Sequence, residues 1–257
     1  MVLMDTLPAG LRTMVGNTAL EENRIGCSGV RAFHVNGLGY LKIASPPLDL
    51  RPEHDRLTWL ARRLPVPQVL YFGVANSQQF MLISEIPGLS SHDEQFRSRP
   101  RRIVTLLAES LKMIHAVDIT GCPFDQQIDA LLATAHRRLI TNQVDESQFD
   151  TARQGRRASD LYAELLATRP IDGAPVFVHG DYCLPNVLVD PGSLTLTGFI
   201  DWGSAGASDR YFDLALAARS ITYNLGAEWV APFFAAYGLA EIDHARITFF
   251  QTLDEFF

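Results

Sequence analysis

Three polar residues interrupt a strand-like part of the sequence and constrain the fold more than any other feature. Residues 178–190 read VHGDYCLPNVLVD, in which polar side chains separate two apolar stretches: His179, Asp181 and Asn186. Packing in a sheet would favour none of these residue types there. A fourth polar residue, Asp201, follows the next apolar stretch, Leu194–Ile200. The segment therefore indicates a polar loop and a strand end joined by a β-hairpin.

The order Asp-x4-Asn, followed by an Asp at a strand end, suits phosphoryl transfer. In such a site one carboxylate orients the acceptor hydroxyl and takes its proton. An amide oxygen and a second carboxylate hold Mg²⁺, which prefers hard oxygen ligands, and the metal neutralises charge on the phosphates. Each piece alone is more typical of a turn or a strand terminus. Their order and spacing together favour a catalytic site.

The composition narrows the choice of partners. The 257 residues carry a formal net charge of −7, which argues against nucleic acid as the main partner and is compatible with a cationic ligand. Three widely spaced cysteines suggest neither a disulfide framework nor a zinc site. No window reaches the roughly 18 apolar residues of a membrane span, and the first residues do not resemble a signal peptide. We therefore expect a cytoplasmic protein with no membrane partner.

The hydrophobic pattern changes at Pro87-Gly88, from strands with one helix to mainly helices. It predicts an α+β fold of two lobes: a small β-rich lobe, residues 1–87, and a larger, mainly helical lobe, residues 88–257. The elements expected in the first lobe are strands Val30–Val35 and Leu38–Ala44 around Asn36-Gly37, helix Pro52–Arg63, and strands Val66–Val74 and Gln79–Ile86. Those expected in the second are a helix over Ile103–Ile114, strand Val176–His179, the hairpin Val187–Val189 with Leu194–Ile200, and helices from about Asp209. The polar stretch Thr141–Ser159 is predicted to be an exposed loop or helix corner.

Other catalytic templates are absent from the sequence. It contains no G-x-x-x-x-G-K-[ST] phosphate loop, no G-x-G-x-x-G dinucleotide fingerprint and no G-x-S-x-G elbow. The seven histidines lack the spacing of a metal site.

The stretches HGDYCLPN, GFIDWGSAGASDRYFDLALAARSI and LDEFF resemble the aminoglycoside 3'-phosphotransferases, or kanamycin kinases. The resemblance extends through SLKMIHAVDITGCPFD and RLTWLARRLPVP to nearly the whole chain. It implies a protein-kinase-like fold, with a nucleotide-binding first lobe and a catalytic and substrate-binding second lobe. It also implies transfer of the γ-phosphate of ATP, or of GTP, to the 3'-hydroxyl of a cationic aminoglycoside with the help of Mg²⁺. The protein is expected to be a monomer or a weak dimer.

The resemblance also implies roles for single residues. Asp181 corresponds to the catalytic base, and Asn186 and Asp201 correspond to the Mg²⁺ ligands. Six positions correspond to nucleotide-binding residues: Lys42 to the phosphate-binding lysine, Glu53 to its helix partner, Tyr40 to a ring against the adenine, Ser84 and Ile86 to the strand that binds the purine edge, and Ser28 to a phosphate-loop serine. His179 and Asp213 are interpreted as structural residues, and Asp213 is expected to bind the backbone of the catalytic loop.

Substrate binding is expected from four acceptors: Asp150, Asp254, Glu255 and the terminal carboxylate of Phe257. Five nearby positions lack the charged or strongly polar residues of close relatives: Gln148, Thr151, Ser204, Ser220 and Tyr223. Each lost charge-assisted hydrogen bond is worth on the order of 1.5–3 kcal/mol, so a narrowed or shifted drug range is one expectation.

Two other functions stay open on the sequence. One is a kinase of the same fold that acts on another hydroxylated molecule, such as a macrolide or an amino alcohol. The missing acidic contacts favour it, whereas the acidic C-terminus argues against it. The other is a nucleotide-binding module without catalysis. A decayed kinase typically lacks at least one of five residues that are all present here: Lys42, Glu53, Asp181, Asn186 and Asp201.

Overall fold

The computed structural model describes residues 6–23 and 29–257 of the chain. The chain divides into two compact units, Met1–Leu89 with Leu188–Gly203, and Ser90–Val187 with Ser204–Phe257. The break near residue 89 lies close to the predicted change of pattern at Pro87-Gly88. Residues 188–203 belong to the first unit because the hairpin they contain packs there: the N–H of Phe199 donates to the carbonyl of Pro65 at 3.0 Å.

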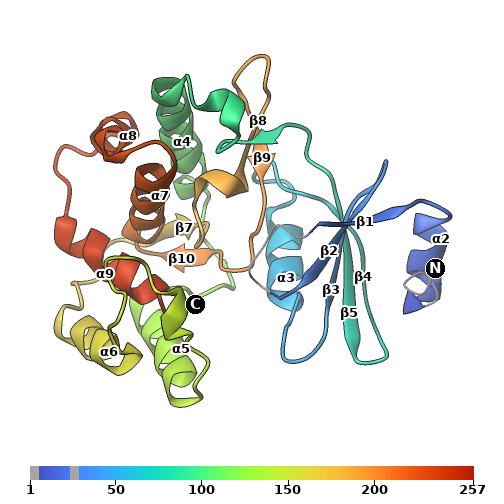
Figure 1. Cartoon of the computed structure of the whole chain (residues 1–257), viewed down its shortest axis with the longest axis horizontal. Coiled ribbons are helices and arrows are strands. Elements are labelled where there is room, and N and C mark those ends of the chain that lie inside the picture. Colours follow the sequence, from blue (N-terminus) through green and yellow to red (C-terminus); the bar gives the residue numbers. More distant parts are fainter. Residues whose placement is uncertain (1–5, 24–28) are drawn as a thin grey trace. The chain divides into compact units, whose positions relative to one another are not determined.

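A five-stranded antiparallel sheet forms the body of the first unit, in the order β1-β2-β3-β5-β4 (Figure 1). Its strands are β1 (Leu20–Asn23), β2 (Arg31–Val35), β3 (Gly39–Ala44), β4 (Val69–Ala75) and β5 (Gln78–Ser84). Two tight turns set the register. Gly37, between β2 and β3, has a φ of 77°, and Asn76 and Ser77, between β4 and β5, have φ of 51° and 60°. Asn76 and Ser77 form a two-residue hairpin turn, which requires positive φ at both positions, whereas three residues with Gly37 in the middle join β2 to β3. Both predicted strand pairs are confirmed by their antiparallel pairing.

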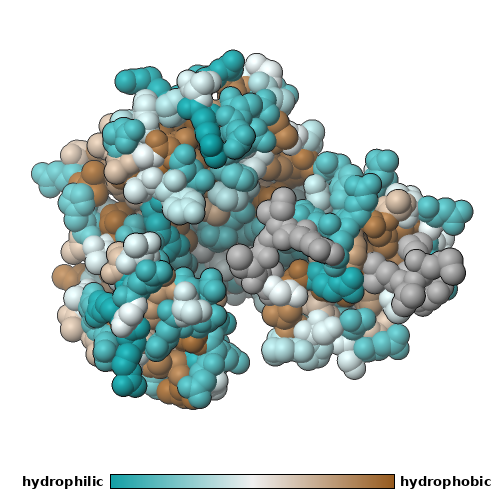
Figure 2. All heavy atoms as spheres, in the orientation of Figure 1, coloured by the Kyte–Doolittle hydropathy of each residue, from teal (hydrophilic) through white to brown (hydrophobic). Residues whose placement is uncertain are grey.

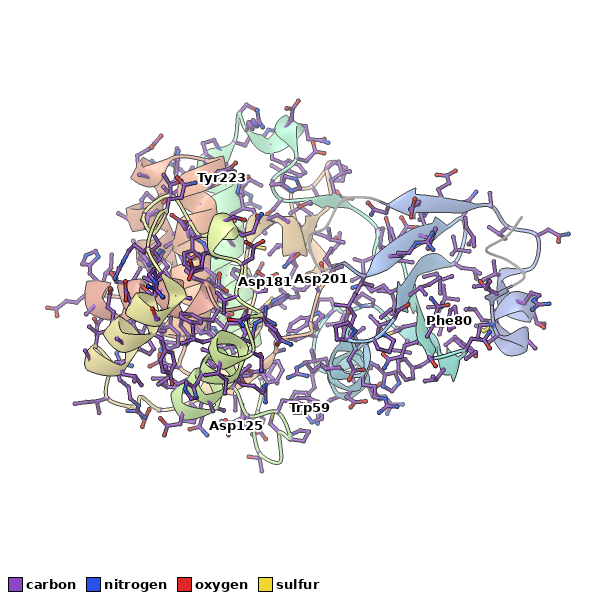
Figure 3. The ribbon with its side chains drawn as sticks, turned by 60° about the horizontal axis from the view of Figure 1, so that its bottom comes forward. Trp59, Phe80, Asp125, Asp181, Asp201 and Tyr223 are labelled. Carbon is purple, nitrogen blue, oxygen red and sulfur yellow. The ribbon has the colours of Figure 1, made fainter. Side chains whose placement is uncertain are left out.

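Helix α2 (Ala9–Val15) and strand β1 of the first unit were not predicted. Leu7, Leu11 and Val15 recur every four residues and are at most 2% exposed, and they pack in one cluster with residues of the sheet such as Phe80 (Figure 3). The four-residue spacing of these apolar side chains was the signal that could have revealed the helix.

Helix α3 (Arg51–Leu60) has Pro52 in its first turn, as predicted, and buries Leu57 and Leu60.

A second sheet has the order β6-β8-β9, formed by β6 (Leu89–Ser90), β8 (Val187–Val189) and β9 (Leu196–Phe199). Strand β9 begins later than the predicted Leu194, because Leu194 takes a φ of 54° within the turn.

Six α-helices and a small sheet make up most of the second unit (Figure 1). The helices are α4 (Pro100–His115), α5 (Ile128–Ile140), α6 (Ala158–Ala167), α7 (Tyr211–Asn224), α8 (Val230–Tyr237) and α9 (His244–Asp254). Strand β7 (Val176–Val178) pairs antiparallel with β10 (Gly206–Ser208). The core of this unit joins apolar side chains of α5, α6, α7 and α9, among which the rings of Phe212 and Phe250 stack at 5.6 Å.

The polar stretch Thr141–Ser159 is not exposed throughout, contrary to the prediction. Phe149 is 4% exposed and belongs to the core of the second unit, and Arg153 is 7% exposed. The guanidinium of Arg153 donates to the hydroxyl of Thr252 on α9 at 3.1 Å. The polar composition concealed this anchoring, because the partner of Arg153 lies almost a hundred residues further along the chain.

Hydrophilic and apolar residues are interspersed on the face of the molecule in Figure 2. None of the helices in the described ranges, 6–23 and 29–257, is long and apolar enough to cross a membrane.

Candidate active site

Lys42, Glu53 and Asp201 form a charged cluster within the first unit. Lys42 lies on β3, and its ammonium donates to both carboxylate oxygens of Glu53 on α3, at 2.7 and 2.9 Å. The same ammonium donates to Oδ1 of Asp201 at 2.7 Å. The side chains of Lys42 and Glu53 are 16% and 11% exposed, whereas that of Asp201 is 50% exposed. The pairing of strand lysine and helix glutamate agrees with the predicted one.

The electrostatics of this cluster keep the lysine charged. Burial alone would lower the pKa of Lys42, but attraction to Glu53 and Asp201, together with hydrogen bonds to both, outweighs it and raises the pKa above its usual value. The cluster thus holds a fixed ammonium between two carboxylates, one of which is open to solvent. Such an ammonium is suited to bind phosphate oxygens.

Asp201 owes its position to the irregular backbone after β9. Its φ is 62°, in the left-handed region that Asp tolerates better than most residues (Figure 3). The next residue, Trp202, is fully buried, and its indole N–H donates to the carbonyl of Phe199 at 3.2 Å. The buried indole therefore anchors the turn, while the aspartate stays half exposed.

The other predicted nucleotide-binding residues lie around the same sheet. Tyr40 is half buried on β3, its ring centre is 5.2 Å from that of His34, and its pKa is raised by burial and by the charge of Glu85. Ser84 is the last residue of β5 and exchanges two hydrogen bonds with the backbone of Gln68. Ile86 follows β5 and is half buried. The sixth predicted residue, Ser28, lies outside the described residues.

The second unit contains the loop after β7, and Asp213 of α7 holds the backbone of this loop by hydrogen bonds. The buried carboxylate of Asp213 accepts the main-chain N–H groups of His179 and Gly180, both at 2.8 Å. Gly180 has a φ of 79°, and a Cβ there would lie 2.2 Å from the carbonyl oxygen of Ser204. Only glycine therefore fits this position without a backbone shift. The structural role predicted for Asp213 is confirmed.

Asp181 and Asn186 meet within this loop. The amide nitrogen of Asn186 donates to the main-chain oxygen and to Oδ2 of Asp181, both at 2.9 Å. Asn186 is buried, whereas Asp181 is exposed. The N–H of Asp181 donates to the ring Nδ1 of His179 at 3.3 Å, in keeping with the structural role expected for that histidine. The loop thus presents one oriented carboxylate to solvent.

Further contacts of the loop were not predicted from the sequence. The buried hydroxyl of Tyr182 donates to the carbonyl of Leu107 on α4 at 2.8 Å, and the N–H of Leu184 donates to the hydroxyl of Ser220 on α7 at 3.0 Å. Ser220, one of the five positions predicted to have lost a charged or strongly polar substrate contact, is therefore an anchor of the loop. His115 of α4 supports the loop indirectly, since its Nε2 lies 3.1 Å from Oδ2 of Asp213, which binds the loop backbone. In the sequence, the histidine at the end of the apolar pattern Ile103–Ile114 was the signal that could have indicated this contact.

The predicted substrate-binding residues gather at the C-terminal end of the second unit, where each contacts an arginine or another member of the group. Asp254 is paired with Arg219 of α7, and Glu255 with Arg153 at 3.4 Å. Glu255 also accepts the main-chain N–H of Asp150 at 3.0 Å. The main-chain oxygen of Phe257 accepts a hydrogen bond from Arg138 at 3.2 Å. The three carboxylates therefore lie together, as the resemblance implied, with arginines among them.

The five positions predicted to have lost a charged or strongly polar substrate contact differ in exposure. Ser220 is half buried, and four are exposed: Gln148, Thr151, Ser204 and Tyr223. Tyr223 is 90% exposed near the end of α7 (Figure 3).

A strand lysine paired with a helix glutamate in a β-rich unit, and an Asp-x4-Asn loop in a helical unit, define a phosphotransferase of the protein-kinase-like class. The model of the phosphotransferase enzyme family matches residues 29–250. The chain belongs to this family.

Individual proteins with similar sequences agree with this assignment. The aminoglycoside 3'-phosphotransferase of Niallia circulans is 36% identical over 97% of this chain and 97% of its own length. That of Streptomyces fradiae is 36% identical over 85% of this chain and 85% of its own.

Solved structures show the same fold. An aminoglycoside 3'-phosphotransferase of type VIII superposes with a TM-score of 0.84 at 32% identity, and covers 96% of this chain and 97% of that one. An aminoglycoside phosphotransferase from Streptomyces rimosus, in complex with ADP and streptomycin, superposes with a TM-score of 0.80 at 26% identity over 96% of this chain and 95% of that one. The predicted α+β, protein-kinase-like fold and the predicted family are confirmed.

Proposed function

We propose that the protein is an aminoglycoside 3'-phosphotransferase that transfers the γ-phosphate of ATP to the 3'-hydroxyl of its substrate. The observation that carries the proposal is the loop of the second unit, where an exposed Asp181 is held by Asn186 and by a backbone tied to the buried Asp213. The 3'-phosphotransferases of Niallia circulans and Streptomyces fradiae, similar over most of the chain, support the substrate class.

Asp181 is proposed as the catalytic base. Its carboxylate would accept a hydrogen bond from the substrate hydroxyl and take the proton as the oxygen attacks the γ-phosphorus. The hydrogen bond from Asn186 orients the carboxylate, and the main-chain N–H of Asp181, which donates to His179, fixes the backbone that carries it. Since phosphoryl transfer asks little covalent chemistry of a protein, this positioning is a large part of the expected rate enhancement.

Lys42 is proposed to bind the α- and β-phosphates, with Glu53 fixing its ammonium. Tyr40, Ser84, Ile86 and Ser28 complete the proposed nucleotide site for ATP or GTP. The bound ADP of the Streptomyces rimosus enzyme supports a nucleotide as the donor.

Asn186 and Asp201 have donor atoms that fit Mg²⁺. The amide nitrogen of Asn186 gives both of its hydrogen bonds to Asp181, so its carbonyl oxygen is turned the other way. The carboxylate of Asp201 is half exposed and is bound through Oδ1 to Lys42. Amide and carboxylate oxygens are the hard ligands that Mg²⁺ prefers. When bound, the metal would offset negative charge on the β- and γ-phosphates.

The cationic substrate is proposed to bind the acceptors at the C-terminal end: Asp150, Asp254, Glu255 and the terminal carboxylate of Phe257. Ammonium groups of an aminoglycoside and carboxylates form charge-assisted hydrogen bonds. We also propose that the protein acts in the cytoplasm, as a monomer or weak dimer, with the first unit binding the nucleotide and the second carrying catalysis and substrate binding.

One experiment tests the proposal directly. ADP release is measured with ATP and Mg²⁺ and a panel of acceptors: kanamycin, neomycin, 3'-deoxy tobramycin, a macrolide and choline. Turnover of kanamycin without turnover of tobramycin is the expected result, because tobramycin lacks the acceptor hydroxyl. Asp181→Asn should abolish turnover and leave nucleotide affinity within about twofold of wild type, since Asn keeps the shape of the side chain but cannot take the proton. Normal turnover by Asp181→Asn would remove that residue from its role.

A second candidate function is a kinase of the same fold for a macrolide or an amino alcohol. Two observations favour it. Gln148 and Thr151 are exposed but uncharged, and Asp254 and Glu255 have arginine partners, so less negative charge is available to a polyamine. Turnover of the macrolide or of choline, with every aminoglycoside silent, would replace the first proposal with this one.

A further inference from the structure

The C-terminal end of the second unit carries a cluster of carboxylates whose negative charge is largely offset by arginines. Its members are three carboxylates and two guanidinium groups, here called the acid cluster: Asp150, Asp254, Glu255, Arg153 and Arg219. The amount of negative charge left for a ligand is therefore much smaller than the number of carboxylates suggests. A guanidinium remains charged at every physiological pH, so this offset does not vary with pH.

Arg219 and Arg153 contact the cluster in different ways. Arg153 is 7% exposed, and it also binds Thr252 at 3.1 Å and the carbonyl of Thr248 at 3.4 Å. It is part of the packing between the loop and α9. Arg219 has a side chain that is 32% exposed, and its contacts to the cluster are the ion pair with Asp254 and a longer one with Glu255 at 3.9 Å. Arg219 is therefore the cation of the cluster that solvent and a ligand can reach.

In the sequence of α7, Arg219 directly precedes Ser220, a residue that contacts the catalytic loop. Its neighbour Ser220 accepts the N–H of Leu184, three residues after Asp181. The ion pair of Arg219 with Asp254 is thus on the part of α7 that borders both the loop and the acid cluster. A substrate ammonium that approaches Asp254 would meet this guanidinium.

We propose that Arg219 is a specificity-determining residue that occupies Asp254 as an internal cation and lowers the affinity for amine-rich aminoglycosides. The inference rests on the proposed function. A substrate ammonium that approaches Asp254 must share the carboxylate with the guanidinium and is repelled by it. The affinity of substrates with fewer ammonium groups, or with hydroxyls at the corresponding positions, is lowered less.

The test measures the dissociation constant of tobramycin, which binds without reacting, by calorimetry on the full chain with ADP and Mg²⁺. Arg219→Met keeps an unbranched apolar side chain and removes the charge. Tobramycin should bind roughly two- to fivefold more tightly to this variant, the range of one partly exposed charge pair, with a larger gain at low salt. Arg169→Met is the matched control, because Arg169 pairs with the exposed Asp129 and Asp172 away from the cluster. It should leave the dissociation constant unchanged.

Two matched substrates report on selectivity. Kanamycin A and kanamycin B differ in carrying a hydroxyl or an amine at one ring position. The ratio of their kcat/KM values should shift toward kanamycin B in Arg219→Met, whereas KM for ATP should stay constant. A general loss of structure would instead lower kcat/KM for both substrates alike and would also change the melting temperature.

A double-mutant cycle shows whether Arg219 competes with the substrate for Asp254 or instead holds Asp254 in place for binding. If Arg219 competes for Asp254, then Asp254→Asn weakens tobramycin binding more in the Arg219→Met background than in wild type. Weaker tobramycin binding by Arg219→Met, or an equal effect of Asp254→Asn in both backgrounds, would overturn the inference. If Arg219→Met does not fold, Arg219→Gln takes its place in the cycle. These outcomes are distinct from failure of the proposed function, which would appear as wild-type protein that phosphorylates no aminoglycoside.

Discussion

Replacing Asp213 by asparagine should disable the catalytic loop without touching any substrate. The carboxylate is fully buried and accepts two main-chain N–H groups at 2.8 Å and a contact from His115 at 3.1 Å. Asparagine keeps one accepting oxygen and places an NH₂ group where the other stood. At least one main-chain N–H, of His179 or of Gly180, would then face a donor.

The size of the effect follows from the charge and the burial. A hydrogen bond to a charged group is worth about 1.5–3 kcal/mol, and breaking a buried charged pair costs about 3–5 kcal/mol. We therefore expect Asp213→Asn to lower the free energy of unfolding by about 3–5 kcal/mol. Because the loop that carries Asp181 loses its anchor, kcat should fall, whereas KM for ATP should change little.

Urea unfolding followed by tryptophan fluorescence gives the stability, and coupled ADP release gives the kinetics. Asp129→Asn serves as the control, because that carboxylate is 80% exposed and pairs only at the surface with Arg169. It should match wild type in both measurements. An Asp213→Asn protein whose stability lies within about 1 kcal/mol of wild type, with normal kcat, would refute the reasoning.

Three further predictions follow from the described contacts. Lys42→Met should raise KM for ATP about tenfold or more, since a lost charge-assisted contact is worth about 1.5–3 kcal/mol; an unchanged KM would exclude Lys42 from phosphate binding. Gly180→Ala should lower stability by about 2 kcal/mol or more and depress kcat, because φ is 79° and the new Cβ would meet the carbonyl of Ser204; wild-type melting and kcat would contradict this. Burial raises the pKa of Glu255 above that of an ordinary glutamate, so on acidification Glu255 becomes protonated at a higher pH. KM for kanamycin should therefore rise as the pH is lowered into the acidic range, and Glu255→Gln should flatten the rise in a pH series; an identical profile in the variant would count against a contact with substrate.

The reactive loop was largely predictable because its parts are close in the sequence. Asp181 and Asn186 are five positions apart, and their mutual hydrogen bonds depend on the local turn that Gly180 permits. The contact of Asp213 with this loop was also predicted, from the resemblance of its motif to that of known kinases. The pairing of Lys42 with Glu53 follows from a strand and helix that are adjacent along the chain.

The anchors and the charge balance were not predictable in the same way. Arg153 was assigned to an exposed loop, yet it is buried against α9, and Ser220 was interpreted as a lost substrate contact, yet it holds Leu184. In both pairs the partners come from elements that meet only when the helices pack. The sequence pattern around one residue does not indicate which distant residue it will contact.

The sequence by itself determined the order of the motifs, the tight turns and the change from a β-rich to a helical pattern, because these depend on backbone preferences and on side chains a few positions apart. Only the tertiary structure decided which arginine meets which carboxylate at the C-terminal end. Arg219 and Asp254 are 35 residues apart, and Arg153 and Glu255 are 102 apart. Long, flexible charged side chains have many candidate partners within one chain, and the packing of α7, α9 and the loop before α6 selects among them.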